Sequence, residues 1–355
     1  MSESSTSAQP IRVGINGLGR SGWNIHARLL EPLSDKFTVV ACLDPKEERR
    51  REAAERFGCK TYVDYGEMLK DDAIDLMVVA TPSHLHAEGA LQAMRAGKDI
   101  VCEKPMASSL ADADRMIAAS KETGKLLAIF QSRRYAADFQ KVQEVIASGK
   151  LGRIVQISLK FHGFSRRWDW QTLQKYGGGS LNNTGPHIVD WAVEFLHEKE
   201  PEVWCHLDRT LTLGDADDHV KLVLRAPGEP VVDIELTSAC AYGQDTWLVM
   251  GTKGTLAGKA SEFKWRYIDE TKQPPREIDE EPTPDRSYNR DELVWEQEET
   301  WKAEDYKGPG IEGFYLDLYE TLRNGAPLVI TPESVRVQMG ILEKCHAQNP
   351  LDAKS

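Results

Sequence analysis

The sequence predicts an α/β protein in which a doubly wound parallel sheet is followed by an α+β domain with a mostly antiparallel sheet. Three observations support this prediction. Short apolar strand candidates alternate with helical segments from Ile11 to Phe130. A glycine-rich turn directly follows the first strand candidate. Beyond Tyr135, strand candidates follow one another with few helices between them, which is typical of an antiparallel sheet.

The chain length and composition set the domain plan and the class of protein. Its 355 residues exceed one ordinary core, so we expect a tail over 1–10, a dinucleotide-binding domain over 11–131 and an α+β domain over 132–355. The formal net charge of −12 argues against nucleic acid or an anionic membrane as partner. No apolar run has the length of a membrane span.

The six cysteines form no C-x-x-C pair, and the histidines have no spacing typical of a metal site. Free thiols indicate a reducing compartment, so we expect a cytoplasmic protein without disulfides, zinc or another metal.

The first strand candidate, Ile11 to Ile15, leads into the G-x-G-x-x-G turn Gly17-Leu18-Gly19-Arg20-Ser21-Gly22. The first glycine permits the tight turn, the second lets the backbone approach a pyrophosphate, and the third lets helix and strand pack closely. Such a motif alone can be a mere loop. Here a helix follows it, and Asp44 ends the next strand at the spacing of a ribose-binding carboxylate, which predicts a Rossmann domain that binds NAD.

The cofactor preference rests on Asp44, because a carboxylate repels the 2′-phosphate of NADP. Asp44 could instead be an ordinary strand-end acid. The basic residues Arg49, Arg50 and Arg51 leave NADP open, although a solvated helix face explains them more simply.

Other strand candidates also end in polar or turn residues, namely Thr81-Pro82, Glu103-Lys104-Pro105 and Gln131. In a parallel sheet the carboxyl ends of the strands share one edge, where ligands bind. We therefore predict that these residues line the cofactor site, and that His86 in the next helix helps to shape it.

The second domain contains a long strand candidate, Arg153 to Phe161, and one clear helix, His187 to Leu196, interrupts the strand candidates. Further helices are expected over Phe139 to Ser148 and Gly313 to Arg323, and after Thr331. The shorter strand candidates are Val203 to Leu207, His219 to Leu224, Val231 to Leu236, Thr246 to Met250 and Thr255 to Ala257. The acidic, proline-rich segment 263–307 is interpreted as a solvated surface arm. We expect the chain to form a homodimer or homotetramer through the free face of this sheet.

With these motifs the chain resembles the Gfo/Idh/MocA family of glucose–fructose oxidoreductase and inositol dehydrogenase. The similarity runs from Ile11 to about Gln348 and includes Ala80-Thr81-Pro82 with His86, Cys102-Glu103-Lys104-Pro105, Gly177 to Gly179, Gly185 with His187, and Asp190. It implies NAD or NADP as cofactor and a sugar or cyclitol as substrate.

The resemblance also implies a role for each matching residue. Lys104 would contact the nicotinamide ribose and the substrate hydroxyl, and His187 would be its acid/base. Asp190 would line or support the pocket. Glu103 and Pro105 would shape the turn, with Pro105 after a cis peptide bond. The simpler interpretations are a lysine that only reaches solvent and a histidine without a role.

One departure concerns Asn183, where dehydrogenases of this family often carry Asp. Asparagine can bind a hydroxyl but cannot accept its proton. Trp168 and Trp170 are candidates for stacking on a sugar, although either could belong to the core. Tyr135 follows the last strand of the first domain and is expected to reach the cleft.

Our first hypothesis is an oxidoreductase that transfers a hydride between nicotinamide and a sugar or cyclitol carbon bearing a hydroxyl or ketone. The second is an enzyme that retains NAD and cleaves or epimerises a glycoside through a transient keto-sugar. The third is a non-catalytic relative that senses NAD and sugar.

Overall fold

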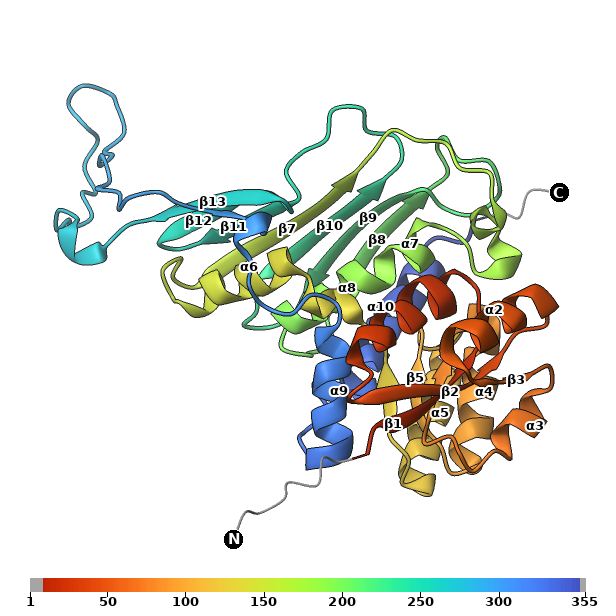
Figure 1. Cartoon of the computed structure of the whole chain (residues 1–355). Coiled ribbons are helices and arrows are strands. Elements are labelled where there is room, and N and C mark those ends of the chain that lie inside the picture. The colour runs from red at the N-terminus through yellow and green to blue at the C-terminus, as the bar shows by residue number, and fades with distance from the viewer. Residues whose placement is uncertain (1–8, 352–355) are drawn as a thin grey trace, which may run out of the picture.

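The computed structural model describes residues 9–351, so residues 1–8 of the predicted tail lie outside it. Figure 1 shows two sheets lying one above the other, with helices between them and around the lower one. The lower sheet is entirely parallel and has the strand order β3-β2-β1-β4-β5-β6. This arrangement confirms the predicted Rossmann domain.

The strands of this sheet are short and apolar because helices cover both faces. They are β1 (Ile11–Asn16), β2 (Phe37–Leu43), β3 (Lys60–Tyr62), β4 (Leu76–Val79), β5 (Asp99–Cys102) and β6 (Leu127–Ile129). The helices are η1 (Gly22–Ala27, a π-helix), α1 (Arg28–Leu30), η2 (Glu31–Leu33), α2 (Glu47–Phe57), α3 (Tyr65–Leu69), η3 (Ser83–Leu85), α4 (His86–Arg95), α5 (Leu110–Thr123) and η4 (Ser132–Tyr135).

The second sheet has eight strands in the order β14-β13-β12-β11-β7-β10-β9-β8. Only β7 and β10 pair in parallel, which confirms the predicted, mostly antiparallel domain. The strands are β7 (Ile154–His162), β8 (Glu202–Asp208), β9 (His219–Arg225), β10 (Val231–Thr237), β11 (Trp247–Gly251), β12 (Gly254–Lys259), β13 (Glu262–Tyr267) and β14 (Glu299–Lys302).

Helices cover one face of this second sheet and lie between it and the first domain (Figure 1). They are α6 (Ala137–Ala147), α7 (Ser180–Asn183), α8 (Gly185–Phe195) and α10 (Pro332–Gln348), whereas α9 (Gly313–Asn324) packs on the first domain. The short turns are η5 (Trp170–Thr172), η6 (Gln174–Tyr176), η7 (Glu270–Lys272) and η8 (Ala303–Asp305). No helix within residues 9–351 has the length and apolar character that crossing a membrane requires.

The chain returns to the first domain near its end. Phe314, Tyr315 and Leu318 of α9 and Val335 of α10 belong to the hydrophobic core that surrounds β1 to β6. The residues beyond 131 therefore complete the first domain as well as build the second, because helices far away in sequence bury its sheet. The predicted division at residue 131 describes the order of the chain but not the composition of the two cores.

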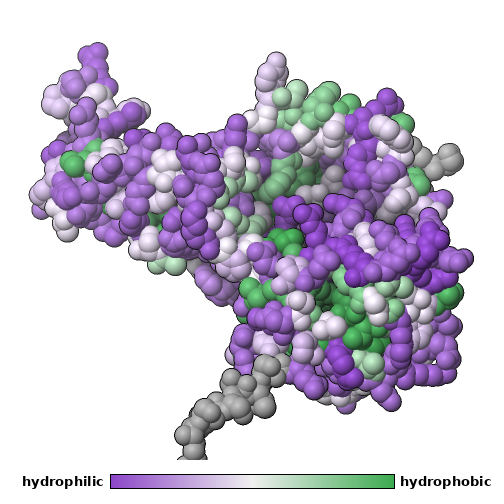
Figure 2. All heavy atoms as spheres, in the orientation of Figure 1, coloured by the Kyte–Doolittle hydropathy of each residue, from purple (hydrophilic) through white to green (hydrophobic). Residues whose placement is uncertain are grey.

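The acidic segment 263–307 is a surface arm only in its middle. Its ends form β13 and β14, and Trp265 and Trp301 are buried there. The part between them projects beyond the sheet in Figure 1 and is covered mostly by hydrophilic residues in Figure 2. Sequence composition missed the two strands because charged and polar residues, most of them basic, alternate with the buried aromatic ones.

Candidate functional site

The glycine-rich turn leaves room for a ligand at one glycine and packs against protein at the other two. Gly17 has a φ of +100°, and a Cβ there would lie 2.6 Å from the Ala80 carbonyl oxygen. A Cβ on Gly22 would lie 1.8 Å from the Gly17 carbonyl oxygen, whereas one on Gly19 would meet nothing within 4 Å. This is the cradle that a pyrophosphate needs, because a side chain at Gly19 would point into the free space.

Asp44 is almost completely buried at the end of β2, where its carboxylate organises the turn. Its oxygens accept hydrogen bonds from the backbone N–H groups of Leu18 at 2.9 Å and Lys46 at 3.0 Å. Arg49 covers the same carboxylate, with Nη1 at 3.2 Å from Oδ2. A ribose would therefore meet Arg49 beside Asp44, which weakens the simple argument that the carboxylate alone repels NADP.

Thr81 and His86 connect the end of β4 to the Lys104-Pro105 turn. The buried His86 ring lies 2.9 Å from the Thr81 carbonyl oxygen and 2.7 Å from the Pro105 carbonyl oxygen. Burial lowers the pKa of His86, and a neutral ring donates to only one of these oxygens. Thr81 Oγ1 is buried and has no partner within the described part of the chain, so it is available to a ligand. The His86 ring thus lies between the Thr81 and Pro105 backbones, in agreement with a supporting position next to the predicted site.

Glu103 fixes the backbone of the neighbouring lysine. Its Oε2 accepts the Lys104 N–H at 3.0 Å, and its Oε1 lies 3.1 Å from His26 Nε2. Burial opposes the charged carboxylate, but the His26 hydrogen bond and charge outweigh this effect and lower the pKa of Glu103 to about 2. His26 in turn contacts the Tyr315 hydroxyl at 2.6 Å. The Lys104–Pro105 peptide is cis, which confirms the expectation from the family resemblance.

Lys104 crosses from the first domain to the second. Its Nζ donates to the Asn183 carbonyl oxygen at 2.8 Å. Burial lowers the pKa of Lys104, Glu103 opposes this shift, and the positive charges of Arg133 and Arg20 add to it. The ammonium is thus held by one neutral oxygen and has donors left for a substrate oxygen.

His187 lies in the first turn of α8, where Gly185 and Pro186 begin the helix. Its Nδ1 is buried and has no hydrogen-bond partner among residues 9–351. Burial, followed by the positive charges of Lys104 and Arg133, lowers the pKa of His187 to about 3. The ring is therefore neutral near neutral pH and can accept a proton from a hydroxyl group.

The predicted glycine run before α7 sets the position of Asn183. Gly179 has a φ of +107°, and a Cβ there would lie 2.2 Å from Asp217 Oδ1. The Asp217 carboxylate accepts the Leu181 N–H at 2.8 Å and so holds the start of α7. Asn183 ends this helix and lies four residues before His187, a spacing that places both on one side of consecutive helical turns.

Three predicted site residues are used by the protein itself. Gln131 is fully buried, and its Nε2 donates to the Pro186 carbonyl oxygen at 3.3 Å. Both oxygens of the buried Asp190 accept from Arg134 at 2.8 Å. The Tyr135 hydroxyl donates to Asp317 at 2.5 Å. These bonds favour the supporting role for Asp190 and give Tyr135 a protein partner, whereas Gln131 Oε1 is buried without a partner among residues 9–351, so a cofactor contact of Gln131 stays a prediction.

Trp168 and Trp170 lie outside the core, with 77% and 54% of their surfaces exposed. The loop that carries them is tied to the site by Gln171, whose Oε1 accepts from Asn183 Nδ2 at 3.4 Å. Both rings are therefore accessible in a loop that contacts Asn183 through Gln171, and sugar stacking stays a prediction.

The sequence missed His26 and Tyr315 as supports of Glu103. His26 stands at an apolar position of the first helix, and Tyr315 lies almost three hundred residues away. In the sequence, the sign of such a role was a histidine at an apolar helix position, one helical turn after Gly22.

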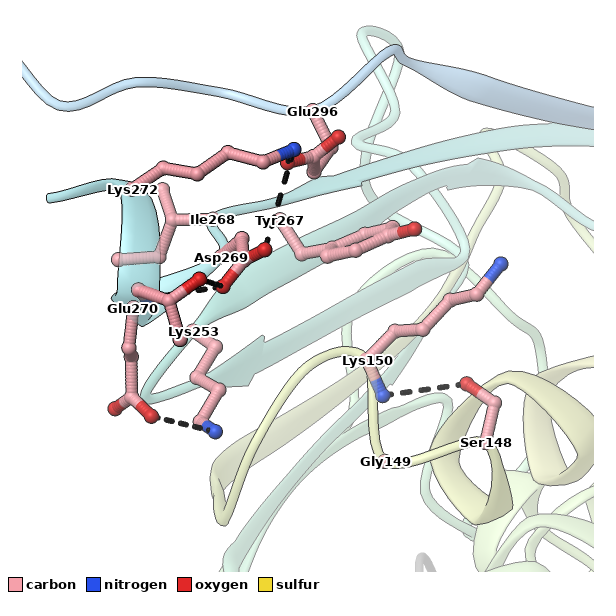
Figure 3. A pocket seen from close by; sticks show the side chains of 11 residues that line it. Ser148, Gly149, Lys150, Lys253, Tyr267, Ile268, Asp269, Glu270, Lys272 and Glu296 are labelled. Carbon is pink, nitrogen blue, oxygen red and sulfur yellow. Dashed lines mark hydrogen bonds and ion pairs between the residues drawn. The ribbon is translucent and has the colours of Figure 1, made fainter.

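An open groove of about 500 Å³ at the base of the arm is lined by Lys150, Lys253, Tyr267, Glu270 and other residues (Figure 3). Its charges pair with one another, as Lys253 does with Glu270 at 2.7 Å. It contains no residue of the predicted site, and we do not consider it a candidate.

Comparisons with known proteins identify the family and the fold of the two domains. Residues 11–131 match the model of an oxidoreductase family with an NAD-binding Rossmann fold, and residues 139–257 match that of a GFO/IDH/MocA C-terminal domain. The structure of an NAD-binding protein from Listeria innocua is similar, with a TM-score of 0.80 at 24% identity over 96% of this chain and 98% of that chain.

Curated relatives include two inositol dehydrogenases. The chain is 31% identical over 257 residues to the myo-inositol 2-dehydrogenase of Thermotoga maritima, which covers 69% of this chain and 74% of the relative. It is 28% identical over 334 residues to the scyllo-inositol 2-dehydrogenase (NADP(+)) of Bacillus subtilis, covering 91% and 89%.

Proposed function

The chain belongs to the Gfo/Idh/MocA oxidoreductase family, and we propose that it transfers a hydride between NAD and a hydroxyl-bearing carbon of a sugar or cyclitol. The observation that carries the proposal is that Lys104 and His187 lie close enough for the lysine charge to lower the pKa of the histidine. Lys104 is anchored to the Asn183 carbonyl oxygen at 2.8 Å, and the neutral His187 has an Nδ1 without a protein partner in the described chain. A cation and a proton acceptor at one place suit the oxidation of an alcohol.

The residues present fit the dinucleotide. The free space at Gly19 would take the pyrophosphate, Arg20 would lie beside its charges, and Asp44 with Arg49 would face the adenosine ribose. Thr81 Oγ1, buried without a partner among residues 9–351, would contact the nicotinamide half. When bound, the dinucleotide supplies the hydride acceptor.

The protein supplies the acid/base chemistry and the charge. In the oxidation, the hydroxyl proton passes to the His187 ring, the hydride leaves the same carbon, and a carbonyl group forms. Lys104 donates a hydrogen bond to the reacting oxygen and stabilises the negative charge that develops there. The Asn183 carbonyl oxygen and the Glu103 carboxylate hold Lys104 in place from both ends of the residue.

The direct test is NADH formation, followed by absorbance, with purified protein and a panel of inositols and hexoses. We expect turnover with at least one compound of the panel, and loss of it in Lys104→Ala and His187→Ala variants that still bind NAD. No turnover in either direction, despite bound cofactor, would contradict net dehydrogenation.

Asn183 favours one second candidate, an enzyme that retains NAD and passes through a transient keto-sugar. The residue that often is Asp in dehydrogenases of this family cannot take a proton here. Conversion of a glycoside without net NADH release would support this candidate, and stoichiometric NADH would exclude it.

We also propose that the free face of the second sheet joins two copies of the chain. Helices cover only one face of this sheet. Its other face carries Trp204, which is 56% exposed, and a row of paired charges that includes Lys160 and Asp233 at 2.6 Å. Sedimentation should give at least a dimer, and Trp204→Glu should shift it toward the monomer. A monomeric wild-type protein would contradict this proposal.

A further inference from the structure

One residue of the loop before the glycine run, Gln171, is bonded to both ends of α7. Its backbone carbonyl oxygen accepts the Gly179 N–H at 3.0 Å, directly before the first residue of this helix. Its side-chain Oε1 accepts from Asn183 Nδ2 at 3.4 Å, at the last residue of the helix. Gly178 allows this close approach, because a Cβ there would lie 2.4 Å from the Gln171 carbonyl oxygen. Gln171 therefore holds the short helix that carries Asn183.

Arg167 fixes which end of the Gln171 amide faces Asn183. Its Nη2 donates to Gln171 Oε1 at 2.8 Å. A guanidinium has donors and no acceptor, so the Gln171 amide cannot turn its own NH₂ group toward it. The Asp169 carboxylate holds Arg167 at 2.9 and 2.8 Å and accepts the Gln171 N–H at 3.0 Å. These side chains are partly exposed, so their bonds contribute orientation more than stability.

The orientation of Gln171 in turn decides the orientation of the Asn183 amide. Because Gln171 Oε1 is an acceptor, only the Asn183 NH₂ group can bond to it, and Asn183 Oδ1 must point away from Gln171. This Oδ1 receives no hydrogen bond from any of residues 9–351. The backbone carbonyl oxygen of the same residue binds Lys104 Nζ at 2.8 Å. Asn183 thus has a free side-chain acceptor and holds the proposed catalytic lysine with its backbone.

The same bonds explain why position 183 is neutral. A carboxylate there would have no N–H group to offer, so one of its oxygens would face Gln171 Oε1, and two acceptors repel each other. Gln171 cannot relieve this repulsion by turning its amide, because Arg167 binds Oε1. The replacement of the frequent Asp by Asn183 therefore goes together with the residues that surround it.

We propose that Gln171, oriented by Arg167, is a positioning residue that turns Asn183 Oδ1 toward the substrate, where this neutral oxygen accepts a hydrogen bond from a hydroxyl group next to the reacting carbon. This inference rests on the proposed function, since it names a substrate group that the same site selects. A compound without this hydroxyl would cover Oδ1 and donate nothing to it, which costs binding energy. The site should therefore prefer a compound with two adjacent hydroxyl groups to its deoxy analogue.

The test uses purified full-length protein with NAD, the panel of inositols and hexoses, and the monodeoxy analogue of each compound. It measures KM and kcat from NADH formation, and the binding of each compound to the NAD complex by calorimetry. For the wild type we expect at least one hydroxylated compound whose KM is about tenfold lower than that of a deoxy analogue, as expected for one hydrogen bond.

The decisive variant is Gln171→Leu, which keeps the size of the side chain but removes the acceptor, so that the Asn183 amide is free to turn. It should raise the KM of the hydroxylated compound about five- to tenfold, and leave the KM of the deoxy analogue, kcat and the NAD affinity within about twofold. Gln171→Glu is the conservative change. Its carboxylate still accepts from Arg167 and from Asn183, so it should restore most of the preference for the hydroxyl group.

Gln174→Leu is the matched control, because Gln174 lies in the same loop but donates to the carbonyl oxygens of Asp215 at 2.6 Å and Leu351 at 3.3 Å. It should change neither KM. A purely structural role of Gln171 would affect both compounds alike and lower kcat and NAD affinity as well. Equal KM changes for the hydroxylated and deoxy compounds, or no change in Gln171→Leu, would overturn the inference.

The two proposals fail differently. NADH formation that is insensitive to Gln171→Leu would keep the dehydrogenase and reject the positioning role. Binding of a hydroxylated compound that weakens in Gln171→Leu but yields no NADH would keep the positioning role and reject net dehydrogenation. No binding of any compound of the panel to the NAD complex would reject both.

Discussion

In the buried region around Arg134, the charges are matched by partners. The guanidinium binds Asp190 at 2.8 Å, Glu194 at 2.6 Å and the Ser334 hydroxyl at 2.9 Å, and so connects η4 to α8 and α10. In the neighbouring unpaired region, the exposed Arg133 side chain and the buried His187 Nδ1 have no protein partners within residues 9–351, and Lys104 has a single neutral one. The same short turn of chain thus supports the fold on one side and offers unused donors on the other.

The difference gives a rule for assigning roles in this molecule. Burial of a charge requires a partner, so a paired and buried ion indicates structure. A cationic group that is positioned by its backbone but left unpaired indicates a ligand. By this rule Asp190 belongs to the structural region, although the sequence places it among the site residues.

The largest expected effect is that of breaking the paired region. Arg134→Ala leaves Asp190 and Glu194 without their cation and should lower the free energy of unfolding by about 3–5 kcal/mol. Urea denaturation followed by fluorescence measures this loss. Arg133→Ala is the control and should stay within about 0.5 kcal/mol of the wild type, as exposed, unpaired residues do. Equal losses in both variants would contradict the division between the two regions.

The unpaired region should respond in activity and not in stability. Lys104→Ala removes the cation that is proposed to bind the reacting oxygen, and turnover should fall roughly a hundredfold or more. The urea midpoint and the NAD affinity should remain close to those of the wild type. Near-normal turnover on a confirmed substrate would remove Lys104 from the mechanism.

The pH dependence of kcat/KM should show that the His187 ring is neutral near neutral pH. Because burial and the charges of Lys104 and Arg133 lower the pKa of His187 to about 3, the base form persists far below the usual histidine value. The kcat/KM of a neutral substrate should therefore not fall between pH 7 and pH 5. Arg133→Gln removes one of the positive charges, raises this pKa and should move any acid limb to higher pH. A wild-type limb near pH 6.5 would show that His187 titrates normally.

A new carboxylate in the unpaired region tests why Asn183 is neutral. Asn183→Asp would place a negative charge one helical turn before His187 and beside the carbonyl that binds Lys104. It raises the pKa of His187 by favouring the protonated ring, so the acid limb of the variant should move to higher pH and turnover near neutral pH should not rise. Turnover against pH on one substrate decides this. A faster variant across the whole range would mean that Asn183 is a weakened form of an ordinary site.

The smallest effect concerns Arg49, whose pairing with Asp44 is intermediate between the two regions. We expect NAD to bind at least several-fold more tightly than NADP in the wild type. Removing Arg49 uncovers the Asp44 carboxylate, so Arg49→Ala should widen this preference a further few-fold. Titration of both cofactors measures it, with Arg51→Ala as control because Arg51 pairs only with Glu55 in the described chain, at 3.9 Å. Tighter NADP binding by the wild type would contradict the expectation.

Local patterns in the sequence were sufficient for the fold class, and they predict the edge of the sheet at which the proposed site lies. The glycine-rich turn requires particular backbone geometry at Gly17 and Gly22, and the alternation of strands and helices leaves few ways to assemble a parallel sheet. Residues after successive strands, such as Thr81 and Lys104, must then share one edge. These conclusions need only short-range geometry and the rules of strand connection.

Only the tertiary structure decided which polar residues are free. Arg133 and Arg134 are neighbours of the same type, and no local pattern tells which of them meets Asp190, 56 residues away. The support of Glu103 by His26 and Tyr315 likewise joins three distant segments. Pairing of buried charges depends on how the cores pack, and α9 and α10 reach the first core only after the whole second domain has been built. The sequence alone predicts the edge of the sheet at which a ligand is expected, whereas long-range packing determines which side chains remain available to it.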